Sequence, residues 1–178
     1  MIGIVVVSHS RALAEAAVAL ATQMTGEGGP AVRVAAGTPD GGLGTDAAEI
    51  AEAIDAVASD DGVLVLMDLG SALLSADLAR ELVTTDARIA LSSAPFVEGL
   101  VAAVVTAAGG ADLAAVAAEV GGAGEAKRRH LGEADDAPEA EGDADHGDPA
   151  SDVASPDAES FETVVTNPSG LHARPAAT

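Results

Sequence analysis

The stretch that decides the fold is IGIVVVSHSRALAEAAVALATQMT, residues 2–25. It opens with a continuous apolar run rich in β-branched residues, residues 2–7, which is typical of a buried strand. The polar turn Ser8-His9-Ser10 follows, and over residues 11–25 apolar side chains recur at spacings of three and four, which predicts a helix. A buried strand that leads directly into a helix indicates the alternating architecture of a parallel sheet.

The same alternation continues along the chain. Short apolar runs predict three more strands, and periodic segments between them predict four more helices, the last of which ends at Gly121 and Gly122. Asp46 and Glu49 predict a capping box. We therefore expect an α/β fold, an open doubly wound parallel sheet of strand order 2-1-3-4 that is flanked by helices. The further strands are expected at residues 31–36, 63–67 and 87–91, and the further helices at residues 46–58, 71–83, 97–108 and 111–120.

The composition excludes several classes of protein. The formal charge is −21, from 29 acidic and only 8 basic residues among 178. The basic residues are too few and too scattered to bind a nucleic-acid backbone. Two Phe and no Tyr or Trp leave no platform for aromatic stacking, and the lack of Cys removes disulfides, thiol nucleophiles and Cys-based zinc sites. The longest apolar stretch, residues 100–111, is shorter than the roughly 20 residues of a membrane span, and no signal segment precedes the first strand. We expect a cytoplasmic protein without a metal or another cofactor.

Charge divides the chain into three segments. Residues 1–130 carry 17 acidic and 7 basic residues, residues 131–160 carry 11 acidic and no basic residues, and residues 161–178 carry one of each. The middle segment consists mostly of Ala, Asp, Glu, Gly, Pro and Ser, so it has too little apolar surface to offset the entropy of ordering. We therefore predict a folded domain at residues 1–130, an acidic disordered linker at residues 131–160 and a further segment at residues 161–178.

Two loops are the candidates for a functional site. In an open parallel sheet, ligands bind beyond the carboxyl ends of the strands where the winding reverses, which here lies between the first and third strands. His9 stands there before a helix N-terminus, whose amides and partial positive charge suit a phosphoryl group on the imidazole. If the strands are neighbours, Asp68 can reach one ring nitrogen of His9, fix the tautomer and leave the other nitrogen to attack. The candidates for phosphoryl binding or support are Ser10, Gly70, which permits close backbone approach, and Ser71, which can donate to a phosphoryl oxygen.

Simpler interpretations stand beside these. His9 can merely pack or cap, Asp68 can cap the helix that follows it, and the glycines of residues 37–45 can serve turn geometry alone. No GxxxxGK[ST], GxGxxG, HExxH or GxSxG motif is present, so a nucleotide-binding kinase, a dehydrogenase, a metalloprotease and a serine hydrolase are disfavoured.

The stretches GIVVVSHSRALAEA, GGLGT and MDLGSALLSAD resemble the IIA domain of the mannose class of the phosphotransferase system, over about residues 1–125. More closely they resemble the DhaM family, the phosphoryl donors of dihydroxyacetone kinase. Mannose-type sugar transporter domains typically carry Gly-Gly-Ser-Pro after the second-loop Asp, whereas this chain has Leu69-Gly70-Ser71-Ala72, which favours the DhaM family. The resemblance also implies a homodimer.

A second resemblance lies near the end of the chain. NPSGLHARPA, residues 167–176, is similar to the active-site segment of the phosphocarrier HPr, and strand-like residues 161–165 precede it. His172 begins a predicted helix, and Arg174 is close enough to neutralise a phosphoryl group on it. The alternative is a tail that happens to contain His and Arg. The sequence stops at Thr178, inside the expected first helix, so we expect a truncated HPr-like fragment that accepts phosphate poorly at His172.

The resemblance implies a phosphoryl relay. Enzyme I would pass a phosphoryl group from phosphoenolpyruvate to the HPr histidine, here His172, and then to His9 and to ADP on a kinase subunit that phosphorylates dihydroxyacetone. The chain would be the donor subunit of this phosphotransferase, with enzyme I, HPr and the ADP-binding kinase subunit as partners. Two alternatives stay open: a sugar-transport IIA component that donates to a IIB permease protein, and a regulatory phosphohistidine module.

Overall fold

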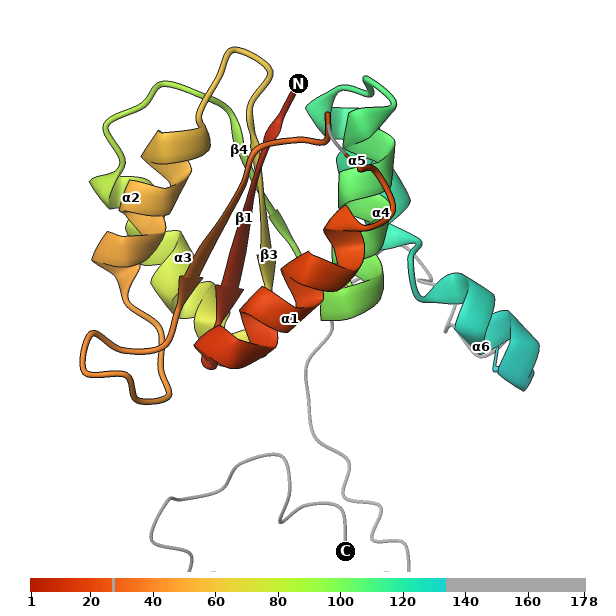
Figure 1. Ribbon diagram of the computed structural model, residues 1–178, viewed down its shortest axis with the longest axis horizontal. Helices are drawn as coiled ribbons and strands as arrows, with labels where there is room; N and C mark the ends of the chain where they lie inside the picture. The colour runs from red at the N-terminus through yellow and green to blue at the C-terminus, as the bar shows by residue number, and fades with distance from the viewer. Residues whose placement is uncertain (27, 134–178) are drawn as a thin grey trace, which may run out of the picture. The chain divides into compact units, whose positions relative to one another are not determined.

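The computed structural model describes residues 1–26 and 28–133 (Figure 1). Within these residues four strands alternate with helices, and two helices follow the alternating part. The expected architecture of an α/β fold is confirmed. The strands are β1 (Gly3–Ser8), β2 (Val32–Ala36), β3 (Val63–Met67) and β4 (Ile89–Ser92), and the helices are α1 (Arg11–Thr22), α2 (Ala47–Val57), α3 (Gly70–Leu82), α4 (Phe96–Ala108), α5 (Leu113–Gly121) and α6 (Glu125–Leu131).

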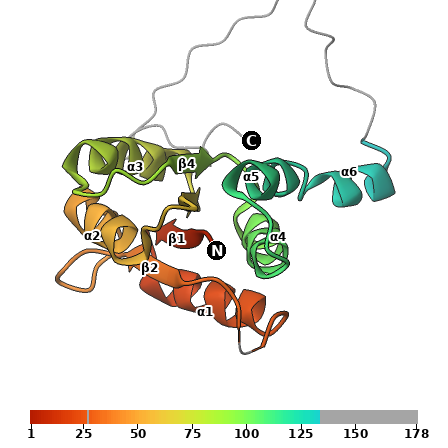
Figure 2. The ribbon, with the colours of Figure 1, turned by 90° about the horizontal axis from the view of Figure 1, so that it is seen from above.

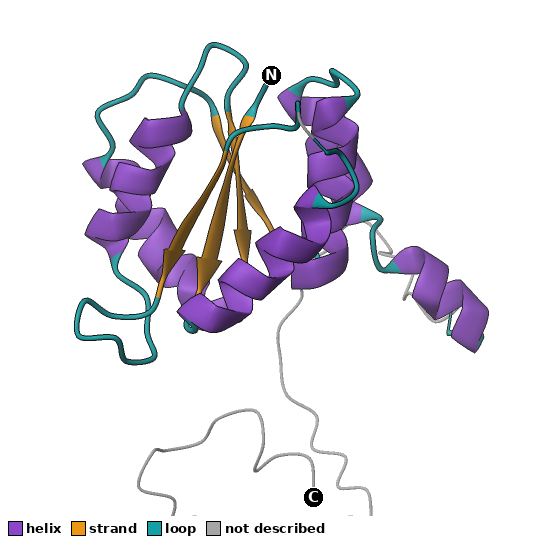
Figure 3. Cartoon of the chain, viewed as in Figure 1, coloured by secondary structure: helices purple, strands orange, loops and turns teal. Residues whose placement is uncertain are grey.

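The sheet is parallel throughout, in the predicted order β2-β1-β3-β4. Helices α2 and α3 lie on one side of it, and α1, α4 and α5 lie on the other (Figures 1 and 2). Figure 3 shows all four strand arrows pointing the same way between these two helical layers. The carboxyl ends of the strands therefore share one edge of the domain, and each of the first four helices starts from it.

Side chains alternate between two aliphatic cores. Ile4 and Val6 of β1 pack with α1, α4 and α5, whereas Val5 and Val7 pack with α2 and α3. The helices meet the sheet largely through alanine, as in α1, where Ala14, Ala17 and Ala21 are buried, and in α3, where Ala72, Ala76 and Ala79 are buried. Small side chains let helix and sheet backbones approach closely, and within residues 1–26 and 28–133 none of the fully buried core residues is aromatic.

The element boundaries differ from the prediction by at most three residues, and both boundaries of β3 are as predicted. Helix α1 ends at Thr22 rather than residue 25, because the chain turns there and Gly26 adopts a φ of +61°. Strand β4 starts at Ile89 rather than residue 87. Asp46 caps α2 as predicted by accepting from the N–H groups of Ala48 and Glu49, whereas the Glu49 carboxylate pairs with Arg11.

Helix α6 was not predicted. Its sequence, EAKRRHL, has no apolar periodicity and none of its residues is buried, so the hydrophobic pattern carries no signal for it. Its last residue, Leu131, is the first residue of the segment expected to be a linker. None of the helices within residues 1–26 and 28–133 is both long and apolar enough to span a bilayer.

The start of β1 packs tightly against α2. A Cβ atom at Gly3 would lie 2.4 Å from the backbone carbonyl oxygen of Val57, the last residue of α2. Glycine at position 3 is therefore required by close approach of two backbones.

We predict that Gly3→Ala destabilises the domain by about 1–3 kcal/mol, because the new methyl group forces α2 away from β1. Urea unfolding followed by circular dichroism measures this change. Gly121→Ala is the matched control, since a Cβ there, at the end of α5, meets nothing within 4 Å. Equal midpoints for the two variants would contradict the packing argument.

Candidate functional site

The site forms where β1 and β3 end side by side. Their register pairs Val7 with Met67, so the next residues along the two strands, Ser8 and Asp68, stand opposite each other. The Ser8 Oγ atom lies 2.9 Å from Oδ2 of Asp68, and Ser8 is fully buried. The two loops singled out by the strand order thus meet through their first polar side chains.

His9 follows Ser8 and makes two contacts with Asp68. Its ring Nδ1 lies 3.0 Å from Oδ1 of the carboxylate, and its backbone N–H donates to Oδ2 at 2.9 Å. The His9 side chain is 26% exposed, whereas that of Asp68 is 7% exposed. Helix α3 has Leu69, not Asp68, at its N-cap position, so the interpretation of Asp68 as a helix cap is wrong.

The environment of Asp68 favours its ionised form. Burial raises the pKa of this carboxyl, but hydrogen bonds from the His9 ring, the His9 backbone and the Ser8 hydroxyl, together with charge on the His9 ring, hold the pKa below its usual value. An ionised carboxylate only accepts hydrogen bonds, so Nδ1 of His9 carries the proton that faces it. In the neutral ring, Nε2 then keeps its lone pair, so it is the ring nitrogen that can act as a nucleophile.

Ser71 covers this second nitrogen. Its Oγ atom lies 3.1 Å from Nε2 of His9, and it sits in the first turn of α3. In the neutral tautomer that carries its proton on Nδ1, the Ser71 hydroxyl donates to Nε2. A Cβ atom added to Gly70, the first residue of α3, would have no neighbouring atom within 4 Å, so the helix start is open on that side.

Ser10, the other candidate for phosphoryl binding or support, stands at the start of α1. It is the N-cap of α1, and its Oγ atom accepts a hydrogen bond from the Leu13 N–H at 3.3 Å. Its backbone N–H donates to the Ser8 hydroxyl at 3.0 Å. The Ser10 side chain therefore fixes the start of α1, and its backbone ties that start to Ser8.

The glycine-rich loop after β2 holds the backbone of the site. Gly37 N–H donates to the Ser8 carbonyl at 3.1 Å, and Gly44 N–H donates to the His9 carbonyl at 2.9 Å. Gly37 needs its glycine, because its φ is +76° and a Cβ would lie 3.0 Å from the Gly42 carbonyl oxygen. The loop also reaches α3 through the Thr45 and Ser75 hydroxyls, 2.8 Å apart. It thus combines turn geometry with support of His9.

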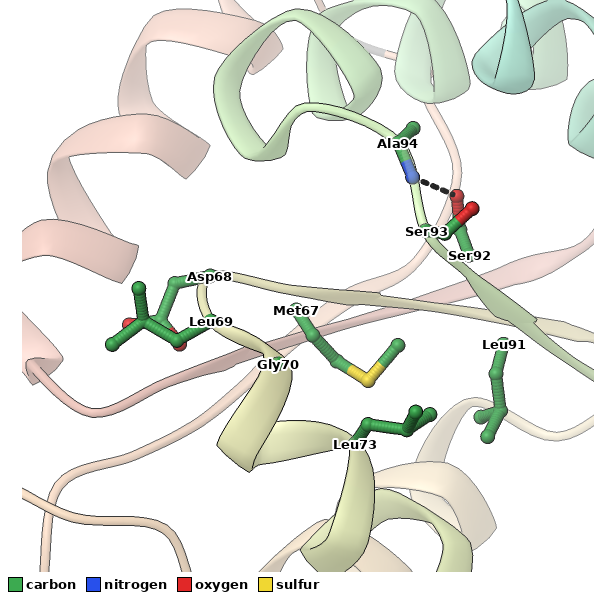
Figure 4. Close-up of a pocket in the computed structure, with 9 residues that line it drawn as sticks. All are labelled: Met67, Asp68, Leu69, Gly70, Leu73, Leu91, Ser92, Ser93 and Ala94. Carbon is green, nitrogen blue, oxygen red and sulfur yellow. Dashed lines mark hydrogen bonds between the residues drawn. The ribbon is translucent and has the colours of Figure 1, made fainter. Parts of the chain in front are cut away.

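A pocket of about 310 Å³ adjoins the site between the ends of β3 and β4 (Figure 4). Asp68, Leu69 and Gly70 form the border that it shares with the site, while His9 lies outside its lining. At the β4 end, the Ser92 hydroxyl accepts a hydrogen bond from the Ala94 N–H at 3.2 Å. Apolar side chains make up much of the remaining wall, namely Met67, Leu73 and Leu91.

The sequence identified His9, Asp68 and Ser71, which the structure brings together, but it gave Ser8 no role at the site. One signal was available. Ser8 is the polar residue that ends the first apolar strand, and the register of β1 and β3 places it opposite Asp68. The predicted site residues His172 and Arg174 lie outside the described residues. So do the whole HPr-like segment and most of the expected linker.

Three comparisons relate this fold and site to known proteins. The family described as PTS system fructose IIA component, EIIA-man, matches residues 3–117. A solved crystal structure of EF1359, a protein of unknown function, is similar with a TM-score of 0.57 and 33% identity, covering 68% of this chain and 94% of that one.

The curated relatives include two phosphoryl donor subunits that are both named DhaM. The phosphoryl donor subunit DhaM of the PEP-dependent dihydroxyacetone kinase of Escherichia coli (strain K12) is 43% identical over 180 residues, which are 99% of this chain and 37% of that protein. The corresponding subunit of kinase 2 of Listeria innocua is 37% identical over 107 residues, 59% of this chain and 85% of that protein. The chain spans little more than a third of the Escherichia coli relative but covers most of the Listeria innocua one. It therefore belongs to the PTS system fructose IIA component family, EIIA-man, and within that family to the DhaM group.

Proposed function

We propose that this chain is the phosphoryl donor subunit of a phosphoenolpyruvate-dependent dihydroxyacetone kinase, which takes up a phosphoryl group on His9 and passes it to ADP on a kinase subunit. The observation that carries the proposal is the His9 ring itself. Its Nδ1 is held 3.0 Å from Asp68, whose side chain is 7% exposed, and its Nε2 faces Ser71 at the start of α3. The relatives from Escherichia coli and Listeria innocua, both named as such donor subunits, support the choice of substrate and partner.

Uptake is a displacement at phosphorus. The Nε2 lone pair forms a bond to the phosphorus atom while the bond between phosphorus and the donor breaks and leaves its electron pair on the donor. The proton on Nδ1 stays in place, so the phosphorylated ring gains positive charge. The ionised Asp68 carboxylate stabilises that charge at 3.0 Å. In the second transfer the same ring leaves as neutral imidazole, and the phosphoryl group bonds to an oxygen of ADP.

Ser71 and the start of α3 complete the proposed site. When phosphorus bonds to Nε2, the Ser71 hydroxyl loses its acceptor and becomes free to donate to a phosphoryl oxygen. The first backbone amides of α3, at Gly70 and Ser71, precede the intrahelical hydrogen bonds and carry the positive end of the helix dipole. A phosphoryl group there gains donors without any cation, which suits a chain with few basic residues.

The remaining parts of the relay stay proposals. Enzyme I and HPr are the proposed source of the phosphoryl group, with His172 and Arg174 as the carrier segment. The acidic segment at residues 131–160 is the proposed tether between His172 and His9, and a cytoplasmic homodimer is the proposed working form.

We predict that His9→Ala abolishes phosphoryl transfer to the kinase while the fold persists, because the ring supplies the nucleophile and is not part of the hydrophobic core. The chain is incubated with phosphoenolpyruvate, enzyme I and HPr, and phosphohistidine is located by mass spectrometry. Formation of dihydroxyacetone phosphate with the kinase subunits and ADP is measured in parallel.

The control for this experiment is His130→Ala, which changes a histidine of the exposed helix α6. It should transfer at the wild-type rate. Retained turnover in His9→Ala would contradict the assignment of the nucleophile. If wild-type phospho-His9 were discharged by a IIB permease protein and not by the kinase subunit with ADP, the substrate part of the proposal would be wrong.

We predict that Asp68→Asn slows phosphoryl uptake by about 10- to 100-fold, because the variant loses a charged hydrogen bond to the ring that becomes positive during transfer. The rate constant is obtained from the time course of phospho-His9 formation. Asp77→Asn, on the exposed side of α3, is the matched control and should leave the rate unchanged. An unchanged rate in Asp68→Asn would show that the carboxylate has no part in the transfer.

Asp68 also predicts a pH effect on stability. Its pKa is lower in the folded protein than in the unfolded chain, so its stabilising contribution is complete above the unfolded pKa and disappears as the pH falls through the folded value. The free-energy difference between wild type and Asp68→Asn should therefore be largest near pH 7 and shrink below about pH 4. Urea unfolding of both proteins across this range measures it, and a constant difference would contradict the pKa assignment.

A further inference from the structure

The proposed mechanism gives no role to Ser8, a buried polar residue that lies beside His9 and Asp68. Its exposure is 0%, and its hydroxyl oxygen has three neighbours. The Ser10 N–H donates to it at 3.0 Å, the Asp68 Oδ2 atom lies 2.9 Å away, and the Ser10 carbonyl oxygen lies 3.0 Å away. The hydroxyl therefore accepts one hydrogen bond and has two acceptors within reach of its single hydrogen.

The carboxylate wins this competition. A hydrogen bond to an ionised acceptor is roughly twice as strong as one to a neutral carbonyl, and Asp68 Oδ2 is the nearer of the two atoms. The bond from Ser10 N–H fixes the position of the oxygen, so the hydrogen is aimed at Asp68. Oδ2 then receives two donors, the Ser8 hydroxyl and the His9 backbone N–H, which leaves Oδ1 for the His9 ring.

We propose that Ser8 is a positioning residue for phosphoryl transfer, whose hydroxyl holds the Asp68 carboxylate in the orientation that the His9 ring requires. This inference rests on the proposed function of His9. It assigns to Ser8 an action through Asp68, not a contact with the phosphoryl group.

Burial makes the hydroxyl hard to replace. Ser8 is fully buried, and the Asp68 side chain is only 7% exposed. If the Ser8 hydroxyl is removed, water therefore has little access to replace its hydrogen bond to Oδ2. The carboxylate then has one restraint fewer on its rotation about the Cβ–Cγ bond. The Ser10 N–H at the start of α1 loses its acceptor at the same time.

The first test measures transfer. Wild type, Ser8→Ala and Ser8→Thr are incubated with phosphoenolpyruvate, enzyme I and HPr, and the rate of His9 phosphorylation is followed by mass spectrometry. We expect Ser8→Ala to react about tenfold more slowly, and Ser8→Thr, which keeps the hydroxyl, to stay within about twofold of wild type. Equal rates for wild type and Ser8→Ala would overturn the proposal.

A matched control separates positioning from loss of stability. Asp112→Ala removes the side-chain cap of α5, which accepts from Ala115 N–H at 2.9 Å, and it lowers the urea midpoint of the domain without touching the site. It should phosphorylate at the wild-type rate. A loss equal to that of Ser8→Ala would assign both effects to destabilisation and overturn the proposal.

The second test needs no phosphoryl transfer. Carbon-13 NMR of the Asp68 carboxyl in the unphosphorylated chain follows its titration, and we expect the pKa to rise in Ser8→Ala and to return towards the wild-type value in Ser8→Thr. An unchanged titration in Ser8→Ala would overturn the inference. If Ser8→Ala does not fold, Ser8→Cys, with a weaker donor of similar size, is measured instead and should shift the pKa in the same direction.

The two readouts distinguish the failure of this inference from the failure of the proposed function. A wild-type His9 that is never phosphorylated would contradict the proposed function, whatever the carboxyl titration shows. A wild-type His9 that is phosphorylated, with Ser8→Ala unchanged in rate and in titration, would contradict only the role of Ser8.

Discussion

The site depends on one contact between two strand ends, the hydrogen bond between the His9 ring and the Asp68 carboxylate at 3.0 Å. The two residues are 59 positions apart in the sequence, and the parallel pairing of β1 with β3 brings them together. Everything that fixes this pairing also fixes the site. The aliphatic residues of both strands are buried on two faces, so a shift in register would expose a core.

The sequence sufficed for the fold because each local signal agreed with the others. Residues 63–67, VLVLM, are uniformly apolar, and they form β3 without any change of boundary. Helix α1 was predicted too long, because Thr22 to Thr25 still fit the spacing of a helix although Gly26 turns the chain. Helix α6 was missed, because a short charged helix without a buried face carries no hydrophobic pattern.

Only part of the site could be predicted from the sequence. His9 and Asp68 follow from strand order alone, because the carboxyl ends of neighbouring parallel strands must meet. Ser8 and Ser10 could not be told apart in this way. Their roles depend on which one is the last residue of β1 and which one caps α1, and that boundary moves by a single residue. The contact between Ser71 and Nε2 depends on side-chain rotamers, which a sequence pattern does not contain.

The ring of His9 is anchored on one edge and accessible from the other, with 26% of the side chain exposed. Its Nδ1 edge is closed by a carboxylate, so Nε2, beside the Ser71 hydroxyl, is the one ring nitrogen left for bonding to another group. If a loading and an unloading partner both react at this nitrogen, as proposed, they cannot do so at the same time. Ping-pong kinetics would follow, in which each partner is a competitive inhibitor of the other.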